Sequence, residues 1–158
     1  MMNKIKLRPA KLTDLEALET FEQGVIRFER PFAPPLKPDP IHYYDIEDLI
    51  KSADACFVVA EMEGELIASG YALIEATKPI KKERYHAYMG FMYVVPAYRG
   101  IGINKKFIDY LIDWAKSRNV SEMVLDVYSE NESALNAYKK VGFQADLLKM
   151  RLNTDKGT

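Results

Sequence analysis

A strand, a glycine-containing turn and a helix follow one another directly in this chain, and this order constrains the fold most. The run from Arg84 to Val95 is rich in the Tyr, Phe, Met and Val typical of strands, and Pro96 stops it. A tight segment with Gly100 and Gly102 leads into an amphipathic helix, and Glu122–Tyr128 has the composition of a short buried strand. The passage predicts a right-handed parallel crossover.

The periodicity of apolar residues predicts further strands and helices on both sides of this passage. Thr13 and Glu16 have the spacing of a capping box that opens the first helix, and Gly142 suits the C-terminal cap of the last one. This order predicts an α/β fold with a mixed sheet and helices on both faces. The other expected strands are Lys4–Arg8, Ala55–Met62, Leu66–Glu75 and Phe143–Leu152, and the expected helices are Thr13–Phe28, His42–Ser52, Ile103–Ala115 and Asn131–Val141.

The length of 158 residues suggests one domain over residues 1–158, with a polar tail from Asn153 to Thr158. The net charge of -1 gives no general attraction to nucleic acid or an anionic membrane, so an anion site must be local. No leader-like apolar core lies in Met1–Arg8, and no apolar run reaches the length of a membrane span. Cys56 is the only cysteine, which fits a cytoplasmic location, and its apolar surroundings favour a packing role over a nucleophilic one.

The turn before the helix has the composition of an anion site. The first N–H groups of a helix are unpaired and lie at the positive end of its dipole. Glycines let a phosphate approach such a backbone closely, and Arg99, Lys105 and Lys106 add positive charge around it. A pyrophosphate suits this arrangement. The Gly-x-Gly pattern alone is equally compatible with glycines that only relieve steric crowding. No Gly-Lys-Ser/Thr follows, so the turn is not a P-loop.

Two segments resemble the core motifs of the GNAT family of N-acetyltransferases. Val94-Val95-Pro96-Ala97-Tyr98-Arg99-Gly100-Ile101-Gly102-Ile103-Asn104 resembles the first, whose pattern is Arg/Gln-x-x-Gly-x-Gly/Ala after a strand that ends in Val-x-Pro. Arg99 and Gly102 match, whereas Asn104 stands where the family has Gly or Ala. Asn131-Glu132-Ser133-Ala134, Tyr138 and Gly142-Phe143 resemble the second motif, and Leu7-Arg8-Pro9-Ala10 with Thr13-Asp14 resembles the family's opening strand and helix.

This resemblance extends over nearly the whole chain and implies a mostly antiparallel sheet of 6–7 strands with a splay between strands four and five. It also implies acetyl-CoA as co-substrate and no metal. The backbone from Arg99 to Asn104 would hold the pyrophosphate, and the backbone from Tyr93 to Val95 would pair with the pantetheine arm. Asn131 would contact that arm or order the site, and it is also a good helix N-cap. The implied cofactor-binding residues are Tyr93, Val94, Val95, Arg99, Gly100, Ile101, Gly102, Ile103, Asn104, Lys105, Asn131, Ala134 and Tyr138.

Acetyl transfer to an amine requires an oxyanion donor, an acid for the leaving thiolate and a base for the amine proton. The resemblance implies that a backbone N–H near Val94, at the bulged end of the fourth strand, is the oxyanion donor. It also places the Tyr138 hydroxyl at the coenzyme sulfur as the general acid. The alternative for Tyr138 is an aromatic residue of the core. Tyr138 lies seven residues after Asn131, so both share one face of their helix.

Three residues are candidates for the base. By family register Tyr88 lies near the position of a Glu or His base, but tyrosine is a poor base at pH 7 and is better suited to orienting a water. His86 is a better base one step farther from the acetyl group. We expect His86, Tyr88, Gly90 and Met92 to share one face of their strand unless a bulge interrupts it. Glu29, at the end of the first helix, is a third base candidate, or it holds an ammonium group by charge.

The segment from Phe28 to Tyr44 contains five of the eight prolines and is therefore extended and stiff. It is either a lid over the acceptor or a solvated surface loop. As a lid it supplies Phe28, Phe32, Tyr43 and Tyr44 as lining and Glu29, Asp39 and Asp45 as charges that attract an amine. The resulting prediction is an acetyltransferase for a primary amine of a small molecule or peptide. A non-catalytic acyl-CoA-binding or regulatory module is the alternative, and the family resemblance makes a homodimer a further expectation.

Overall fold

The structure is a computed structural model that describes residues 4–155. The chain divides into two compact units, one up to Asp126 and one from Val127. The first three residues and the last three, which include the end of the expected polar tail, lie outside the described residues. None of the described helices is both long enough and apolar enough to cross a membrane.

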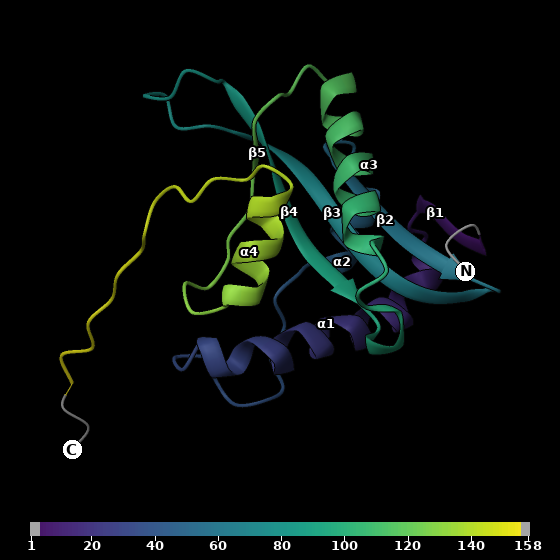
Figure 1. Ribbon diagram of the computed structural model, residues 1–158, viewed down its shortest axis with the longest axis horizontal. Coiled ribbons are helices and arrows are strands. Elements are labelled where there is room, and N and C mark those ends of the chain that lie inside the picture. Colours follow the sequence, from purple (N-terminus) through teal and green to yellow (C-terminus); the bar gives the residue numbers. More distant parts are fainter. Residues whose placement is uncertain (1–3, 156–158) are drawn as a thin grey trace. The chain divides into compact units, whose positions relative to one another are not determined.

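The first unit is built on a five-stranded sheet in the order β1-β2-β3-β4-β5 (Figure 1). The first four strands pair antiparallel and β5 runs parallel to β4, which confirms the mixed α/β sheet. The strands are β1 (Ile5–Pro9), β2 (Ala55–Met62), β3 (Glu65–Ala76), β4 (Tyr85–Val94) and β5 (Met123–Val124).

The expected count of 6–7 strands is wrong, because the sheet formed by residues 4–155 has five. The predicted strand Phe143–Leu152 is absent from the described residues, and the one predicted over Glu122–Tyr128 shrinks to β5. Alternating apolar residues make a strand only where a neighbouring strand pairs with the backbone. In the described segment after Phe143 the side chains of Leu147 and Met150 are instead 88% and 84% exposed.

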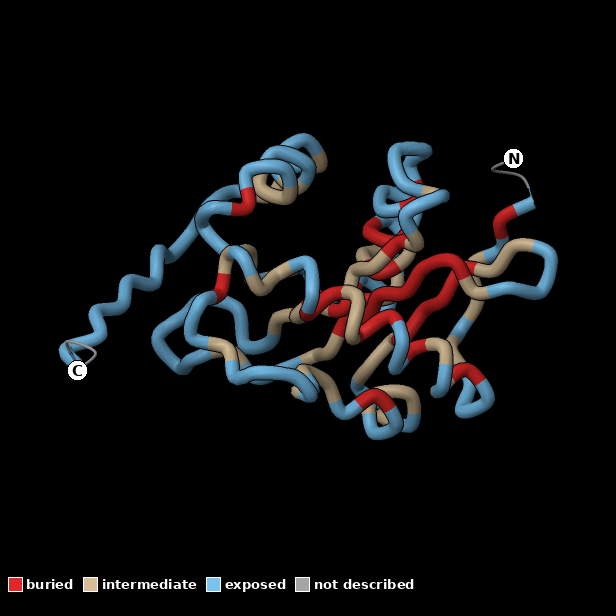
Figure 2. Tube along the Cα trace, turned by 90° about the horizontal axis from the view of Figure 1, so that it is seen from below, coloured by how far each residue is buried: buried red, intermediate tan, exposed pale blue. Residues whose placement is uncertain are grey.

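Helices cover both faces of the sheet, as predicted. They are α1 (Leu15–Glu29), α2 (Ile46–Lys51) and α3 (Ile103–Ser117). Gly24 of α1 lies against the ring of Tyr93, whereas Phe107 of α3 lies beside Met92 next to Gly70 of β3. Because Met92 and Tyr93 are neighbours in β4, α1 and α3 lie on opposite faces. The buried residues gather along the central strands between them (Figure 2).

The core on the α1 side joins Leu18, Phe21 and Val25 of the helix to Phe57 and Phe91 of the sheet. Burying one such side chain contributes about 1.5–3 kcal/mol, so this cluster fixes α1 against the strands.

Cys56, on β2, is half-buried, and burial raises the pKa of its thiol to about 11. Little thiolate forms at neutral pH, which favours the packing role over the nucleophilic one.

The predicted capping box of Thr13 and Glu16 is wrong. A single 3₁₀ turn, Leu12–Asp14, leads into α1 instead, and the Asp14 carboxylate accepts the Lys11 N–H at 2.8 Å. The guanidinium of Arg8 in β1 donates two hydrogen bonds to the same carboxylate, at 2.9 and 3.0 Å. The entry to the helix is therefore fixed by an ion pair with the first strand, a contact that local spacing does not reveal.

Replacing Asp14 with asparagine is expected to lower the free energy of unfolding by about 1.5–3 kcal/mol at pH 7. The Arg8 hydrogen bonds hold the pKa of Asp14 below its usual 3.8 against the opposing effect of burial. This stabilisation is thus present above pH 3.8 and is lost as pH falls through the lowered folded-state pKa. Urea unfolding at pH 7 and at a series of pH values falling from 3.8, with the exposed Asp113→Asn as control, checks it. A loss that stays equal over the whole series would contradict it.

The part of the second unit that the structure describes contains one helix, α4 (Glu132–Lys140), and both predicted caps are confirmed. At its start, the Asn131 side chain accepts the Ala134 N–H at 3.2 Å. At its end, Gly142 adopts φ 109° and donates to the carbonyl of Lys139, while the N–H of Phe143 donates to that of Tyr138. These two bonds form a Schellman motif, and the Phe143 ring packs edge-on against Tyr138 at 5.7 Å, which gives that motif its usual apolar contact.

Candidate functional site

Within the described part of the first unit, the strand β4 has an open edge over its second half. Of its ten residues only Ala87 and Tyr88 pair with β5, so the predicted splay between these strands is confirmed. The N–H of Val95 donates to Ile67 of β3 at 2.8 Å, and neighbouring residues of a strand point their backbone groups to opposite sides. The backbone groups of Val94 therefore face the open edge. An extended ligand can add there as a further strand.

A bulge shapes β4 just before this edge. Between the pairs Ser69–Tyr93 and Tyr71–Gly90, β3 advances by two residues and β4 by three. Phe91 lies in the bulge with φ 55°, and the Ser69 hydroxyl donates to its carbonyl at 3.1 Å.

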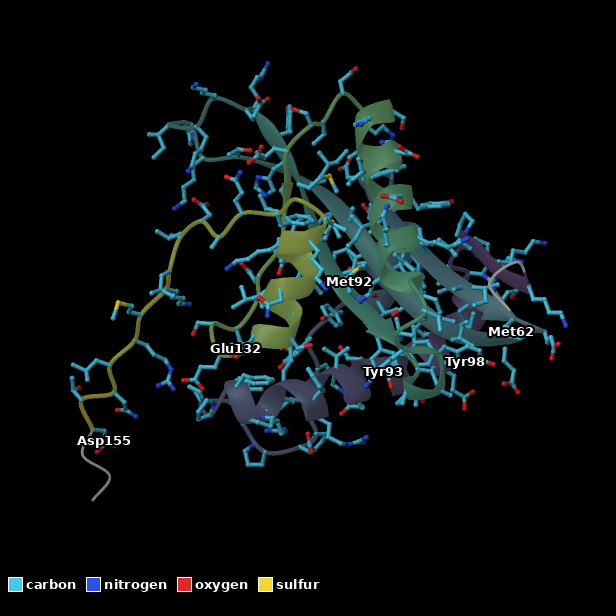
Figure 3. The ribbon with its side chains drawn as sticks, viewed as in Figure 1. Met62, Met92, Tyr93, Tyr98, Glu132 and Asp155 are labelled. Carbon is cyan, nitrogen blue, oxygen red and sulfur yellow. The ribbon has the colours of Figure 1, made fainter. Side chains whose placement is uncertain are left out.

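The extra residue reverses which face the following side chains occupy. Tyr88 and Tyr93 pack on the core under α1, whereas Met92 points to α3 (Figure 3). Met92 was expected to share a face with Tyr88 unless a bulge interrupts the strand, and the bulge at Phe91 places it on the other face. The bulge also lies at Phe91, earlier in the strand than the expected position near Val94.

The turn after β4 needs its glycines for their backbone conformation. Gly100 and Gly102 have φ values of 80° and 91°, and a Cβ at either position would meet no atom within 4 Å. The left-handed backbone, and not steric crowding, thus explains these glycines. Gly102 is the N-cap of α3, and no side chain caps that end of the helix. The first N–H groups of α3, which start at Ile103 and Asn104, have the arrangement that binds phosphate groups.

Two of the cations predicted to surround the turn have internal partners. The Arg99 Nε donates to the carbonyl of Val94 at 2.8 Å, and its guanidinium lies over the ring of Tyr93 at 5.6 Å. Arg99 therefore ties the turn to the end of β4. Lys105 pairs with Asp109, one helical turn farther on, at 2.9 Å on the exposed surface.

A cluster of tyrosines covers the bulge on the α1 side. The ring of Tyr44 stacks on Phe91 with centroids 4.5 Å apart and planes at 11°, and it meets Tyr71 edge-on at 6.0 Å. The ring centroids of Tyr71 and Tyr88 lie 6.5 Å apart, and the Tyr88 hydroxyl donates to the carboxylate of Asp126 at 3.0 Å. A groove of about 320 Å³ next to α2 includes Tyr44 and Tyr71 in its wall.

The tyrosines of this cluster stay protonated at neutral pH. Burial raises the pKa of Tyr71 to about 12, and it raises the pKa values of Tyr44 and Tyr88 further. The charge of Glu29 adds to the shift of Tyr44, and that of Asp126 adds to the shift of Tyr88. These hydroxyls can donate hydrogen bonds to a ligand, but they are poor bases.

The other two base candidates differ in their surroundings. Burial raises the pKa of Glu29, and a hydrogen bond with the Tyr43 side chain opposes that shift. Both ring nitrogens of His86 are engaged, Nδ1 with the hydroxyl of Thr77 and Nε2 with the carboxylate of Glu75, each at 3.0 Å. His86 thus joins the ends of β3 and β4, while Glu29 lies beside the tyrosine cluster.

The structure brings together only part of the predicted acceptor lining. Tyr43 and Tyr44 pack edge-on at 5.7 Å within the core, whereas Phe28 and Phe32 pack on each other at 6.0 Å and Phe28 is 53% exposed. The two predicted aspartates have structural partners instead. Asp39 pairs with Arg30 at 2.6 Å, and Asp45 caps α2 through the N–H of Asp48.

Sequence reasoning did not single out Glu22, Tyr71 or Asp126. Glu22 had a recognisable signature, because it lies four residues after Leu18 and so falls on the apolar stripe of α1. Tyr71 and Asp126 had none, since the register of β3 and the end of β5 bring them to the cluster.

Comparisons with known proteins agree with this geometry. The model of the acetyltransferase (GNAT) family matches residues 22–143. An N-alpha-acetyltransferase of Sulfurisphaera tokodaii is 26% identical over 147 residues, which cover 88% of this chain and 80% of that protein. N-alpha-acetyltransferase 30 of Saccharomyces cerevisiae is 37% identical over 65 residues, but the match spans only 37% of its length and 41% of this chain. A predicted acetyltransferase of Clostridium acetobutylicum, solved with acetyl-CoA, shares the fold with a TM-score of 0.74, 23% identity and coverage of 94% and 96% of the two chains.

Proposed function

Because this chain belongs to the acetyltransferase (GNAT) family, we propose that it is an N-acetyltransferase that moves the acetyl group of acetyl-CoA to a primary amine of a small molecule or peptide. The observation that carries the proposal is the uncapped, glycine-containing start of α3 beside the open edge of β4. Family membership and the N-acetyltransferase relatives support acyl transfer in general. The acceptor amine and the roles below are our proposals.

The residues present fit the coenzyme. The N–H groups from Gly100 to Asn104 suit the pyrophosphate, because the positive φ values of Gly100 and Gly102 set the path of the turn, whereas the Arg99 N–H donates to the Pro96 carbonyl at 3.3 Å. The Val94 N–H at this edge suits a carbonyl of the pantetheine arm, while the Val94 carbonyl accepts from the Arg99 side chain. Asn131, Ala134 and Tyr138 of α4 would contact the thiol end of that arm.

The reaction requires the amine nitrogen to bond to the acetyl carbon while the carbon–sulfur bond breaks. A backbone N–H of the bulged part of β4 would stabilise the oxyanion. Tyr138 would give its hydroxyl proton to the leaving thiolate. Glu29 would take the proton that the amine loses. Burial raises the pKa of this carboxyl group toward neutral pH, which makes the carboxylate a stronger base. Tyr88, held by Asp126, would orient the amine or a water.

The direct test is incubation of the protein with acetyl-CoA and a panel of small amines, amino acids, polyamines and short peptides, with thiol release followed by a colorimetric reagent. We expect at least one amine class to increase thiol release well above the rate with acetyl-CoA alone. Calorimetry with acetyl-CoA alone gives the second measurement. Tight binding without turnover of any amine would contradict the enzyme and favour the non-catalytic acyl-CoA-binding module.

Replacing Glu29 with glutamine is expected to lower kcat/KM about tenfold, since water can take over part of the role of a general base. The carboxylate acts only when ionised, so the activity of the parent should rise with pH through the raised pKa of Glu29. The variant should lack this acidic limb. A pH–rate profile checks both effects, and Glu16→Gln, exposed on the same helix, is the control. An unchanged acidic limb would exclude Glu29 as the base.

A further inference from the structure

Glu22 of α1 is a carboxylate buried to 1% exposure. Its Oε2 accepts the N–H groups of Tyr43 and Tyr44, both at 2.8 Å, and its Oε1 lies 2.9 Å from Nδ1 of His42. Burying a carboxylate is strongly unfavourable unless hydrogen bonds compensate. These three bonds supply that compensation, so helix α1 and the segment after the prolines fit each other specifically.

The two backbone groups that Glu22 holds lead directly to the tyrosine cluster. Tyr44 is the residue whose ring stacks on Phe91 at the β4 bulge. Gln23, the next residue of α1, donates to the carbonyl of Ile41 at 3.0 Å and anchors the same segment a second time. The bonds to Glu22 thus fix the backbone from which the Tyr44 ring reaches the bulge.

Apolar packing alone does not explain a glutamate at this position. Leucine would fill similar space, but it would leave the N–H groups of Tyr43 and Tyr44 without an acceptor. Part-buried N–H groups that lose their acceptor are destabilising, and a backbone that lacks its acceptor shifts toward water. The Tyr44 hydroxyl also lies within the electrostatic range of Glu29, Tyr71 and Tyr88, so a shift of this segment rearranges the cluster that covers the bulge.

We infer that Glu22 is a positioning residue for the acceptor side of the site. It holds Tyr44 over the β4 bulge and so sets which amines fit there. This inference rests on the proposed function only in assigning that side to the amine. Glu22 itself touches neither substrate. Glutamine can replace it in part, because one amide oxygen can accept both N–H groups, whereas leucine cannot.

The first experiment needs no acceptor. Hydrogen exchange is measured at the amides of Tyr43 and Tyr44 in the full chain, with Glu22→Leu, Glu22→Gln and the exposed Glu19→Gln, one turn away on α1, as control. We expect exchange at least tenfold faster in Glu22→Leu, within threefold of the parent in Glu22→Gln, and unchanged in the control. The amide of Val59 in β2 reports on the fold. Unchanged exchange in Glu22→Leu would overturn the inference.

The second experiment uses the amine of the panel above that the parent turns over with the highest kcat/KM. We expect Glu22→Leu to raise the KM for this amine at least tenfold. Its kcat should stay within threefold of the parent, and its Kd for acetyl-CoA within twofold. In Glu22→Gln most of this rise in KM should be absent. A fall in kcat with unchanged KM, or equal losses in both variants, would overturn the inference. If Glu22→Leu does not fold, Tyr44→Leu must give the same rise in KM. If no amine is turned over, the proposed function fails and the exchange rates alone decide the role of Glu22.

Discussion

Replacing Tyr138 with phenylalanine is expected to lower kcat about 100-fold and to leave the Kd for acetyl-CoA within twofold. Phenylalanine keeps the ring that packs against Phe143 and leaves the backbone bonds of the Schellman motif intact. The hydroxyl group that would protonate the thiolate is lost, and a positioned general acid contributes about 10²–10⁴ in rate. Steady-state and single-turnover kinetics with the amine found in the panel would measure the change, so that product release cannot hide it.

The matched control is Tyr110→Phe, which removes a hydroxyl from α3 that has no place in the proposed chemistry. We expect its kcat to stay within twofold of the parent. A loss of less than tenfold in Tyr138→Phe, with chemistry rate-limiting, would contradict the acid and leave Tyr138 as the packing partner of Phe143. The variant separates a role of the Tyr138 hydroxyl as general acid from a role of its ring in packing. The structure of the second unit does not distinguish them, because the ring packs at the end of the helix in either case.

Much of the fold was predictable because its determinants are local. The strand Ala55–Met62 has its predicted bounds, since a β-rich apolar run ends at the turn residues Glu63 and Gly64. The helix after the glycine turn begins at Ile103 as expected, because Gly102 marks the start of its amphipathic pattern. In each case a few adjacent residues contain the information that sets the boundary.

The failures share one physical cause, which is dependence on a distant partner. The bulge at Phe91 exists only relative to the register of β3, so alternation along β4 predicted the wrong face for Met92. The segment after Phe143 alternates like a strand, but pairing requires a neighbouring strand, which alternation does not supply.

The candidate site follows the same division between local and distant determinants. The conformation of the turn at Gly102 was predictable, because adjacent glycines and the helix start define it. The hydrogen bond from the Tyr44 N–H to the Glu22 carboxylate was not predictable, because it joins a helix to a backbone group 22 residues farther along the chain. The hydrogen bond from Arg99 to the Val94 carbonyl was likewise not predictable. A cation beside a glycine-containing turn is more readily interpreted as a contact for a phosphate ligand than as a donor to the backbone.

Replacing Gly102 with valine is expected to raise the Kd for acetyl-CoA about 30-fold. The space beside Gly102 is open, so the effect comes from the backbone, whose φ of 91° is strongly unfavourable for a β-branched residue. A left-handed conformation costs about 1–2 kcal/mol for an ordinary residue, and 2 kcal/mol corresponds to about 30-fold in affinity. To avoid that strain the turn must change its path, and the N–H groups at the start of α3 then no longer converge on one anion. Calorimetry with acetyl-CoA and with free coenzyme A measures the loss.

Gly64, in the hairpin between β2 and β3, provides a closely matched control. Its φ is 86° and a Cβ there would also meet no atom within 4 Å, so Gly64→Val introduces nearly the same backbone strain away from the turn. Both variants should lose a similar free energy of unfolding, but only Gly102→Val should lose affinity for the coenzyme. Equal Kd values in the two variants would mean that the turn does not hold the pyrophosphate. Equal losses with free coenzyme A and with acetyl-CoA would place the effect at the phosphate end of the ligand, because the acetyl group is then irrelevant to it.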